Sequence, residues 1–252
     1  MLNMTSTKKP TGYVIYEGPS LIDGQPIVAI ALTHSSNRKT GDMVQTYILR
    51  QDVKPTEALR TGQDVSICGD CKHRPANGGA CYVVVAQGPT VVWKGYRAGR
   101  YPAAQPGQYQ ALGEGRMVRL GTYGDPAAVP AWVWEALTER ARGRTGYTHQ
   151  WNSKAGRQGA GALRQLVMAS VDTPAELAQA RAQGWRTFRV RTAAQSVAPG
   201  EFTCPASEEA GKRKTCTECG ACDGAQRGAG KASPVIVVHG SKARRFIALT
   251  PV

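Results

Sequence analysis

The sequence predicts an α/β protein with a partial or complete (β/α) barrel, an N-terminal β-meander and a C-terminal cysteine-rich segment. Strand and helix patterns alternate in the second half of the chain, and three consecutive strand patterns precede them. An open α/β sheet fits the same alternation. We divide the 252 residues into a basic tail at 1–11, a β-rich part at 12–115, a β/α core at 116–199 and a cysteine-rich segment with closing strands at 200–252.

The N-terminal strands are predicted from β-rich runs bounded by Gly, Pro or Asp. GYVIYEG (12–18) and PIVAIALTH (26–34) form the first two, and the alternating MVQTYILR (43–50) forms a third. The polar, basic stretch between the last two is expected to be a loop that joins paired strands. Residues 103–115, rich in Gly, Pro and Gln, connect this part to the core.

The core alternates between strand and helix patterns. MVRLGTY (117–123), TGYTHQW (145–151) and WRTFRVRT (185–192) are predicted strands. VPAWVWEALTERAR (129–142) has apolar residues at a helical period, and LRQLVMASVD (163–172) reads as a short helix that runs into a strand. This order implies right-handed crossovers and parallel strands.

The strongest helix signal is TPAELAQARAQG at 173–184, in which Thr173 and Glu176 form a capping box. After the cysteine-rich segment, PVIVVHG (234–240) and RFIALTPV (245–252) are predicted to close the chain as β structure.

The chain is strongly basic. Lysine and arginine outnumber aspartate and glutamate by 32 to 18, which gives a net charge of +14. This excess attracts polyanions and favours nucleic acid as substrate or partner, with a basic enzyme lacking such a partner as the alternative. No run of eighteen or more apolar residues exists, so we expect no transmembrane helix, and because no apolar run follows the first two lysines we expect no signal peptide. The sequence does not indicate an oligomeric state.

Basic residues interleaved with aromatic ones are the candidates for nucleic-acid contact, because basic side chains bind phosphates and aromatic rings stack on unpaired bases. A tryptophan in this setting also serves as a core residue. The candidates are Arg38, Lys39, Trp93, Lys94, Arg97, Arg100, Lys212 and Arg213.

Seven cysteines fall into two groups and predict metal binding. Without a secretion signal, reduced thiolates held by metal are favoured over a disulfide framework. The C-terminal group follows C-x11-C-x2-C-x2-C, which suits either zinc or a [4Fe–4S] cluster, with free surface thiols as the alternative. Its members are Cys204, Cys216, Cys219 and Cys222.

The first group, Cys68, Cys71 and Cys81, has the spacing C-x2-C-x9-C. Three thiolates can bind three irons of a [4Fe–4S] cluster and leave the fourth iron open for another ligand. Alternatively, His73 or an acidic residue completes a closed zinc site, or the thiols carry no metal.

Polar residues follow the predicted core strands, and in a β/α barrel such loops form the active face. The alternative for Asp125 is a helix cap, and the alternative for His149 is a half-buried structural histidine. Asp172 beside Thr173 is more typical of capping than of catalysis. The catalytic candidates are Asp125, His149 and Ser170, and the cofactor-binding candidates are Tyr123, Gly124 and Gln150.

The order of these motifs resembles the phage gene-product-eighty-eight family, over roughly residues 34–224. The segments that carry the resemblance are NRKTGDMVQTYIL, CGDC with CYVV, WKGYR, RLGTYGDP, GYTHQW, CPASEEAGK and TCTECGAC. Those phage proteins are similar to radical-SAM enzymes, in which a three-cysteine motif ending in Cys-Tyr precedes a β/α barrel. A second cysteine cluster that opens with Cys-Pro is also typical of them.

The resemblance implies a [4Fe–4S] cluster on Cys68, Cys71 and Cys81, with S-adenosylmethionine at the free iron. Electron transfer would then cleave that cofactor to a deoxyadenosyl radical. A phage enzyme of this kind would work in the host cytoplasm. The basic charge makes nucleic acid the expected substrate, and modification of a DNA base is a candidate reaction. The alternatives are a non-enzymatic DNA- or RNA-binding phage protein with zinc sites, and a structural phage protein with one zinc knuckle.

Overall fold

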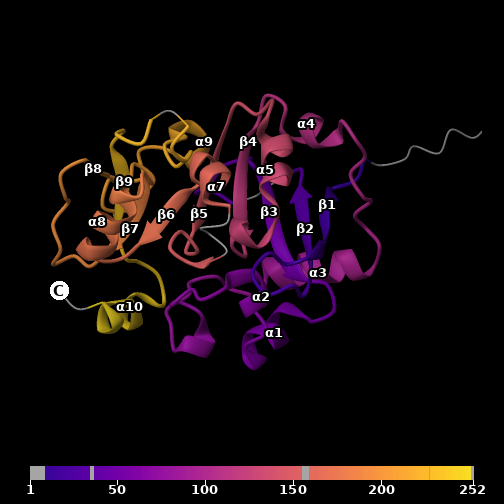
Figure 1. The fold of residues 1–252 in the computed structure, drawn as a ribbon, viewed down its shortest axis with the longest axis horizontal. Helices are drawn as coiled ribbons and strands as arrows, with labels where there is room; N and C mark the ends of the chain where they lie inside the picture. The colour runs from indigo at the N-terminus through magenta and orange to yellow at the C-terminus, as the bar shows by residue number, and fades with distance from the viewer. Residues whose placement is uncertain (1–8, 35–36, 155–158, 227, 251–252) are drawn as a thin grey trace, which may run out of the picture.

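A nine-stranded mixed sheet forms the centre of the molecule, in the order β1-β2-β3-β4-β5-β6-β7-β9-β8 (Figure 1). The structure is a computed structural model that describes residues 9–34, 37–154, 159–226 and 228–250. The α/β class is confirmed. The strand order has β1 and β8 at its two ends, and closure into a barrel is not seen in the described residues. Of the basic tail expected at 1–11, residues 1–8 lie outside the described ranges.

The predicted β-meander is confirmed. β1 (Gly12–Pro19), β2 (Pro26–Leu32) and β3 (Val44–Arg50) are antiparallel neighbours in chain order. Short helices follow β3 within the part predicted to be β-rich. They are α1 (Pro55–Thr61), α2 (Val65–Cys68), η1 (Pro75–Asn77), α3 (Gly88–Arg97) and α4 (Gln108–Gly113).

From β3 onward every neighbouring pair of strands is parallel, as the alternating pattern predicts. The strands are β4 (Met117–Tyr123), β5 (Gly143–Thr148), β6 (Met168–Val171), β7 (Thr187–Arg191), β8 (Glu201–Thr203) and β9 (Ser233–Val237). The helical elements are η2 (Pro126–Ala128), α5 (Ala131–Thr138), α7 (Ala160–Leu166), α8 (Pro174–Ala182), α9 (Cys216–Cys219) and α10 (Ala243–Leu249). The capping box of Thr173 and Glu176 starts α8 as predicted.

The two faces of the parallel strands have different roles. On β4, Val118 and Leu120 are fully buried in the main apolar core together with Trp134 of α5. The alternate residues of the same strand, Arg119 and Tyr123, line a cavity on the opposite face. The sheet therefore uses one face for the hydrophobic core and leaves the other for a site.

The prediction of β structure at 245–252 is wrong. Residues 243–249 form α10, and residues 251–252 lie outside the described ranges. Phe246 is 4% exposed and its ring stacks on His73 with centroids 5.5 Å apart, while Ile247 is 51% exposed. The burial of the Phe246 ring stabilises a helix here, and this tertiary contact overrides the β propensity of the segment. No helix in the described ranges is long and apolar enough to cross a membrane.

Candidate functional site

A cavity of about 530 Å³ is lined by all seven cysteines of the chain. Its wall also takes every second residue of the parallel strands, such as Thr145 and Tyr147 of β5 and Phe188 and Val190 of β7. The two cysteine groups lie far apart in the sequence, yet they meet at one site.

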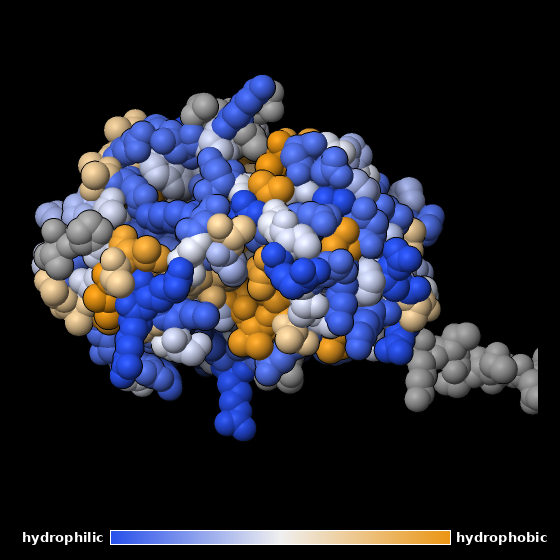
Figure 2. Space-filling view, turned by 90° about the horizontal axis from the view of Figure 1, so that it is seen from below, coloured by the Kyte–Doolittle hydropathy of each residue, from blue (hydrophilic) through white to orange (hydrophobic). Residues whose placement is uncertain are grey.

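The carboxyl ends of the parallel strands form one edge of the molecule. The segments that follow β3 and β9, including α1, α2 and α10, lie along the lower edge in Figure 1. Figure 2 views this lower side and shows apolar side chains exposed in several places among polar and charged ones, including a patch near the middle of the face. Because strand-end loops form the active face of parallel α/β folds, this is where a site is expected.

Buried polar contacts hold the three-cysteine loop in place. Arg74 forms an ion pair of 2.7 Å with Asp64 and donates further hydrogen bonds to the carbonyls of Gly69 and Gly62. The backbone N–H of Cys81 donates to the carbonyl of His73 at 2.9 Å. These bonds hold the loop around its cysteines.

Burial controls the chemistry of these thiols. It raises the pKa of Cys68 and of Cys81, and it raises the pKa of Cys71 to about 12. The three thiols therefore stay protonated at neutral pH unless a bound cation stabilises the thiolate form. By donor type the set suits a thiolate-bound metal centre.

The distances between the cysteine side chains bear on whether a single metal ion or a larger cluster fits. No three His, Cys, Asp or Glu side chains in the described parts of the chain form a group that could hold a metal ion. A single zinc at about 2.3 Å from each sulfur needs its thiolates within about 4 Å of one another. A four-iron cluster is larger than one ion, so its thiolate ligands lie farther apart.

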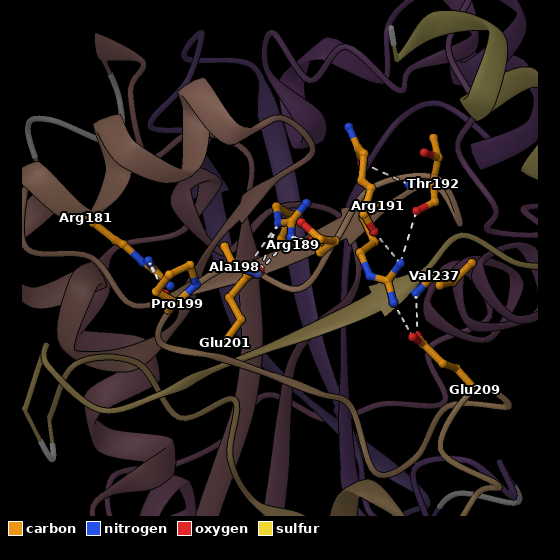
Figure 3. Close-up of polar contacts among 11 residues, drawn as sticks. Arg181, Arg189, Arg191, Thr192, Ala198, Pro199, Glu201, Glu209 and Val237 are labelled. Carbon is orange, nitrogen blue, oxygen red and sulfur yellow. Dashed lines mark hydrogen bonds and ion pairs between the residues drawn. The ribbon is translucent and has the colours of Figure 1, made fainter. Parts of the chain in front are cut away.

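Arginines of β7 anchor the four-cysteine segment (Figure 3). Arg189 forms an ion pair of 2.6 Å with Glu201 and donates to the carbonyl of Ser196. Arg191 pairs with Glu209. A third arginine, Arg186, lies just before β7 and pairs with Asp223. The acidic partners of the three arginines lie in three different parts of the cysteine-rich segment. Arginines 186, 189 and 191 are therefore buried structural anchors.

Backbone contacts then place the four cysteines. Cys204 N–H donates to Val235 O at 2.8 Å, and Gly146 N–H donates to Cys222 O at 3.2 Å. The N–H of Cys216 donates to the carbonyl of Lys39 at 3.0 Å, so the β2–β3 loop packs against α9. The sequence favours α9 locally through a capping box between Thr215 and Glu218.

Asp125 organises the strand ends. One carboxylate oxygen accepts hydrogen bonds from Thr148 Oγ1 at 2.7 Å and from Ala127 N, and the other accepts from His149 N at 2.7 Å. Burial raises the pKa of Asp125 to about 6. This geometry favours a positioning role, in which the carboxylate caps η2 and holds the loop after β5.

A second polar network lies on the same side of the cavity. His73 Nε2 is 2.6 Å from Oδ2 of Asp172, and Lys72 Nζ is 2.9 Å from the same oxygen. Burial alone would raise the pKa of Asp172, but the hydrogen bonds and charges of His73 and Lys72 lower it. Asp172 is therefore an ionised partner of His73, and Thr173 is the cap of α8.

His149 lies beside this pair, with its ring centroid 5.6 Å from that of His73. Burial lowers the pKa of His149 to about 4, so its imidazole is neutral at physiological pH. A neutral imidazole on a cavity wall can accept a proton or a hydrogen bond from a bound ligand.

Most of the predicted strand-end residues line the cavity. Gln150 does not, and instead its side-chain amide donates to the carbonyl of Cys68 at 2.9 Å. The predicted residues that do line it are Tyr123, Gly124, Asp125, His149 and Ser170. Sequence reasoning missed Arg119, which the alternation within MVRLGTY places on the same face as Tyr123.

The candidates for nucleic-acid contact are dispersed. Lys39 lines the cavity, and its Nζ is 3.3 Å from His239 Nε2. Trp93 of α3 is partly buried and donates from Nε1 to the carbonyl of Arg50, with Arg97 over its ring at 5.6 Å. Other members are exposed and lie outside the cavity wall. They are Arg38, Lys94, Arg97, Arg100, Lys212 and Arg213.

No family model, curated protein or solved structure matches the chain. The geometry of the cavity and the chemistry of its residues therefore carry the functional interpretation.

Proposed function

We propose that this chain is a radical-SAM-like iron–sulfur enzyme that acts on nucleic acid. The observation that carries the proposal is the meeting of all seven cysteines at one cavity against the parallel strands. A trio on the loop after β3 and a quartet around β8 and α9 match the order of motifs that resembles the phage gene-product-eighty-eight family. We further propose that the parallel strands form a partial β/α barrel around this cavity.

Cys68, Cys71 and Cys81 would hold a [4Fe–4S] cluster with one iron open to S-adenosylmethionine. Such a cluster, when bound, supplies an electron for reductive cleavage of that cofactor. The chain's own residues would bind and orient the ligands of the cavity. Asp125 fixes the loop after β5, and neutral His149 offers a ring nitrogen to a ligand proton. The quartet would hold a second [4Fe–4S] cluster or a zinc ion.

Nucleic acid is the proposed substrate, and modification of a DNA base is the proposed reaction. The net charge of +14 supports a polyanionic substrate, and Lys39 brings a basic side chain to the cavity itself. Exposed Lys212 and Arg213 lie between Cys204 and Cys216, and exposed Arg38 lies in the β2–β3 loop that packs against α9.

Anaerobic purification followed by reduction tests the proposal. The protein should absorb broadly near 400 nm and, with dithionite and S-adenosylmethionine, release 5′-deoxyadenosine. The variant Cys68→Ala/Cys71→Ala/Cys81→Ala should abolish this release, while a four-alanine variant of the quartet should keep a 400 nm band from the trio. A colourless protein that contains only zinc would refute the proposal.

One observation favours a second candidate, a non-enzymatic zinc protein that binds nucleic acid. His73 Nε2 is held by Asp172, and His73 Nδ1 is buried with no hydrogen-bond partner among the described residues. A carboxylate behind one ring nitrogen is the usual arrangement of a metal-ligating histidine. In this reading His73 would complete a Cys3His site, and the three thiols would have to come closer together around the ion than they lie in this structure. His73→Gln would then lower the bound zinc, whereas in the enzyme it would leave the iron content unchanged.

A further inference from the structure

Arg119 brings a positive charge to the wall of the cavity. It lies on β4, and its guanidinium carbon is 4.7 Å from the centroid of the Tyr147 ring. Its polar neighbours are Tyr147, which shares a hydrogen bond with it, Tyr82 and Cys216, and within the described residues no carboxylate forms an ion pair with it. A half-buried guanidinium in a cavity wall without a carboxylate partner can take an anion, and arginine is well suited to binding planar or tetrahedral oxyanions.

A second polar group without a partner lies next to it. Thr145 pairs directly with Arg119 across β4 and β5. Thr145 lines the same cavity and is only 2% exposed. Its hydroxyl is buried and has no hydrogen-bond partner among the described residues. Buried hydroxyls in folded proteins are nearly always hydrogen-bonded, so this one indicates a missing partner.

The charges around the cavity are divided between two sides. The only carboxylates in the wall, within the described residues, are Asp125 and Asp172, and both are engaged by hydrogen bonds at the strand ends. Lys39 and Lys242 lie in the wall together with Arg119. An anionic ligand group is therefore attracted to Arg119 and repelled from the strand-end carboxylates.

Beside Arg119 the wall is aromatic and apolar. The rings of Tyr147 and Phe188 have centroids 4.6 Å apart, and Ile236 lies in the same wall. A cavity of about 530 Å³ falls within the size range of sites for small organic ligands. A guanidinium that can bind an oxyanion, next to an aromatic wall, is the pattern that the phosphate and base of a nucleotide would match.

We infer that Arg119 and Thr145 bind a phosphate group of the substrate, so that the cavity takes one nucleotide unit of a nucleic-acid strand. This inference rests on the proposed function and names the substrate group that the cavity recognises. Arg119 donates charge-assisted hydrogen bonds to the phosphate, and the Thr145 hydroxyl donates a further one. The base lies against Tyr147 and Phe188.

Ligand pairs that differ only in phosphate test the inference. Binding of each deoxynucleoside 5′-monophosphate and its matching nucleoside is measured by calorimetry on the whole purified protein. The wild type should prefer the phosphorylated ligand, and Arg119→Gln should weaken that ligand about ten- to hundredfold while leaving nucleoside binding unchanged. Arg119→Lys should keep part of the preference, and Thr145→Val should reduce it by a smaller factor.

Arg142→Gln is the matched control. Arg142 is exposed and does not line the cavity, and its substitution by glutamine removes the same charge. It should leave both affinities unchanged. The inference is overturned if the wild type shows no phosphate preference, if Arg142→Gln has the same effect as Arg119→Gln, or if Arg119→Gln weakens only S-adenosylmethionine. Iron is measured on the same samples. A phosphate preference in protein without iron would refute the proposed function but support the phosphate site. Bound iron without a phosphate preference would support the proposed function but refute the phosphate site.

Discussion

The side-chain amide of Gln150 donates a hydrogen bond of 2.9 Å to the carbonyl of Cys68, which ties the loop after β5 to the three-cysteine loop. Gly69 makes this contact possible. Its φ is +58°, and a Cβ at this position would lie 2.3 Å from Gln150 Oε1. The three-cysteine loop is thus shaped by a contact between segments about eighty residues apart.

Gly69→Ala should therefore disturb the first cysteine group. The backbone angles of Gly69, with ψ at −136°, cost an alanine about 1–3 kcal/mol, and displacement of Gln150 adds about 1 kcal/mol for its lost hydrogen bond. Gly99→Ala is the control, because Gly99 also has a positive φ of +67° but open space around its Cβ. Chemical denaturation should show a larger loss of unfolding free energy for Gly69→Ala, together with less bound metal. Equal losses and equal metal in the two variants would contradict this contact.

The buried pair of Arg189 and Glu201 should be essential for the four-cysteine segment. Their side chains are 2% and 0% exposed, so Glu201→Gln leaves a buried guanidinium without its counter-charge and should cost about 3–5 kcal/mol. The exposed pair of Glu208 and Lys212 is the control, and Glu208→Gln should leave the melting temperature unchanged. A Glu201→Gln protein with the same melting temperature as the wild type would show that the pair of Arg189 and Glu201 is dispensable.

Asp125 should give stability an unusual pH dependence. Because its pKa is raised from 3.8 to about 6, the folded protein keeps a proton that the unfolded chain has released. The stabilisation is fully present below pH 4 and is lost as the pH rises through 6. Relative to the non-titrating Asp125→Asn, the wild type should lose about 1–2 kcal/mol of unfolding free energy between pH 5 and pH 7. The exposed Glu135→Gln should give no such difference, and a pH-independent gap between wild type and Asp125→Asn would contradict the shift.

Phe246 should hold α10 against the cysteine loop. Phe246→Ala removes the ring that stacks on His73, whereas Ile247→Ala removes a side chain that is 51% exposed. Amide hydrogen exchange across 243–249 should become faster in the first variant and stay unchanged in the second, because only the first loses a buried contact. Equal exchange in both would mean that other contacts hold the helix.

Local signals predicted much of this fold. The alternation of MVRLGTY gave the bounds 117–123 that β4 has, and the capping box placed the start of α8. These features depend on residues close in sequence. RFIALTPV was misread because its structure depends on where Phe246 packs, and no local signal carries that information.

The site was predictable in its parts but not in its assembly. The spacing divided the cysteines into three and four, and whether each group binds metal stays a prediction. That both groups line one cavity depends on the sheet order, which brings β4 and β5 between them. The pairing of His73 with Asp172 joins residues almost one hundred positions apart, so capping was the natural local interpretation of Asp172.

Metal analysis of anaerobically purified protein tests the central claim most directly. Two four-iron clusters would give about eight irons per chain, and one cluster with a zinc quartet about four irons and one zinc. The account predicts that Cys68→Ala/Cys71→Ala/Cys81→Ala loses about four irons and keeps the metal of the quartet. A wild type without iron, or a triple variant with undiminished iron, would contradict it.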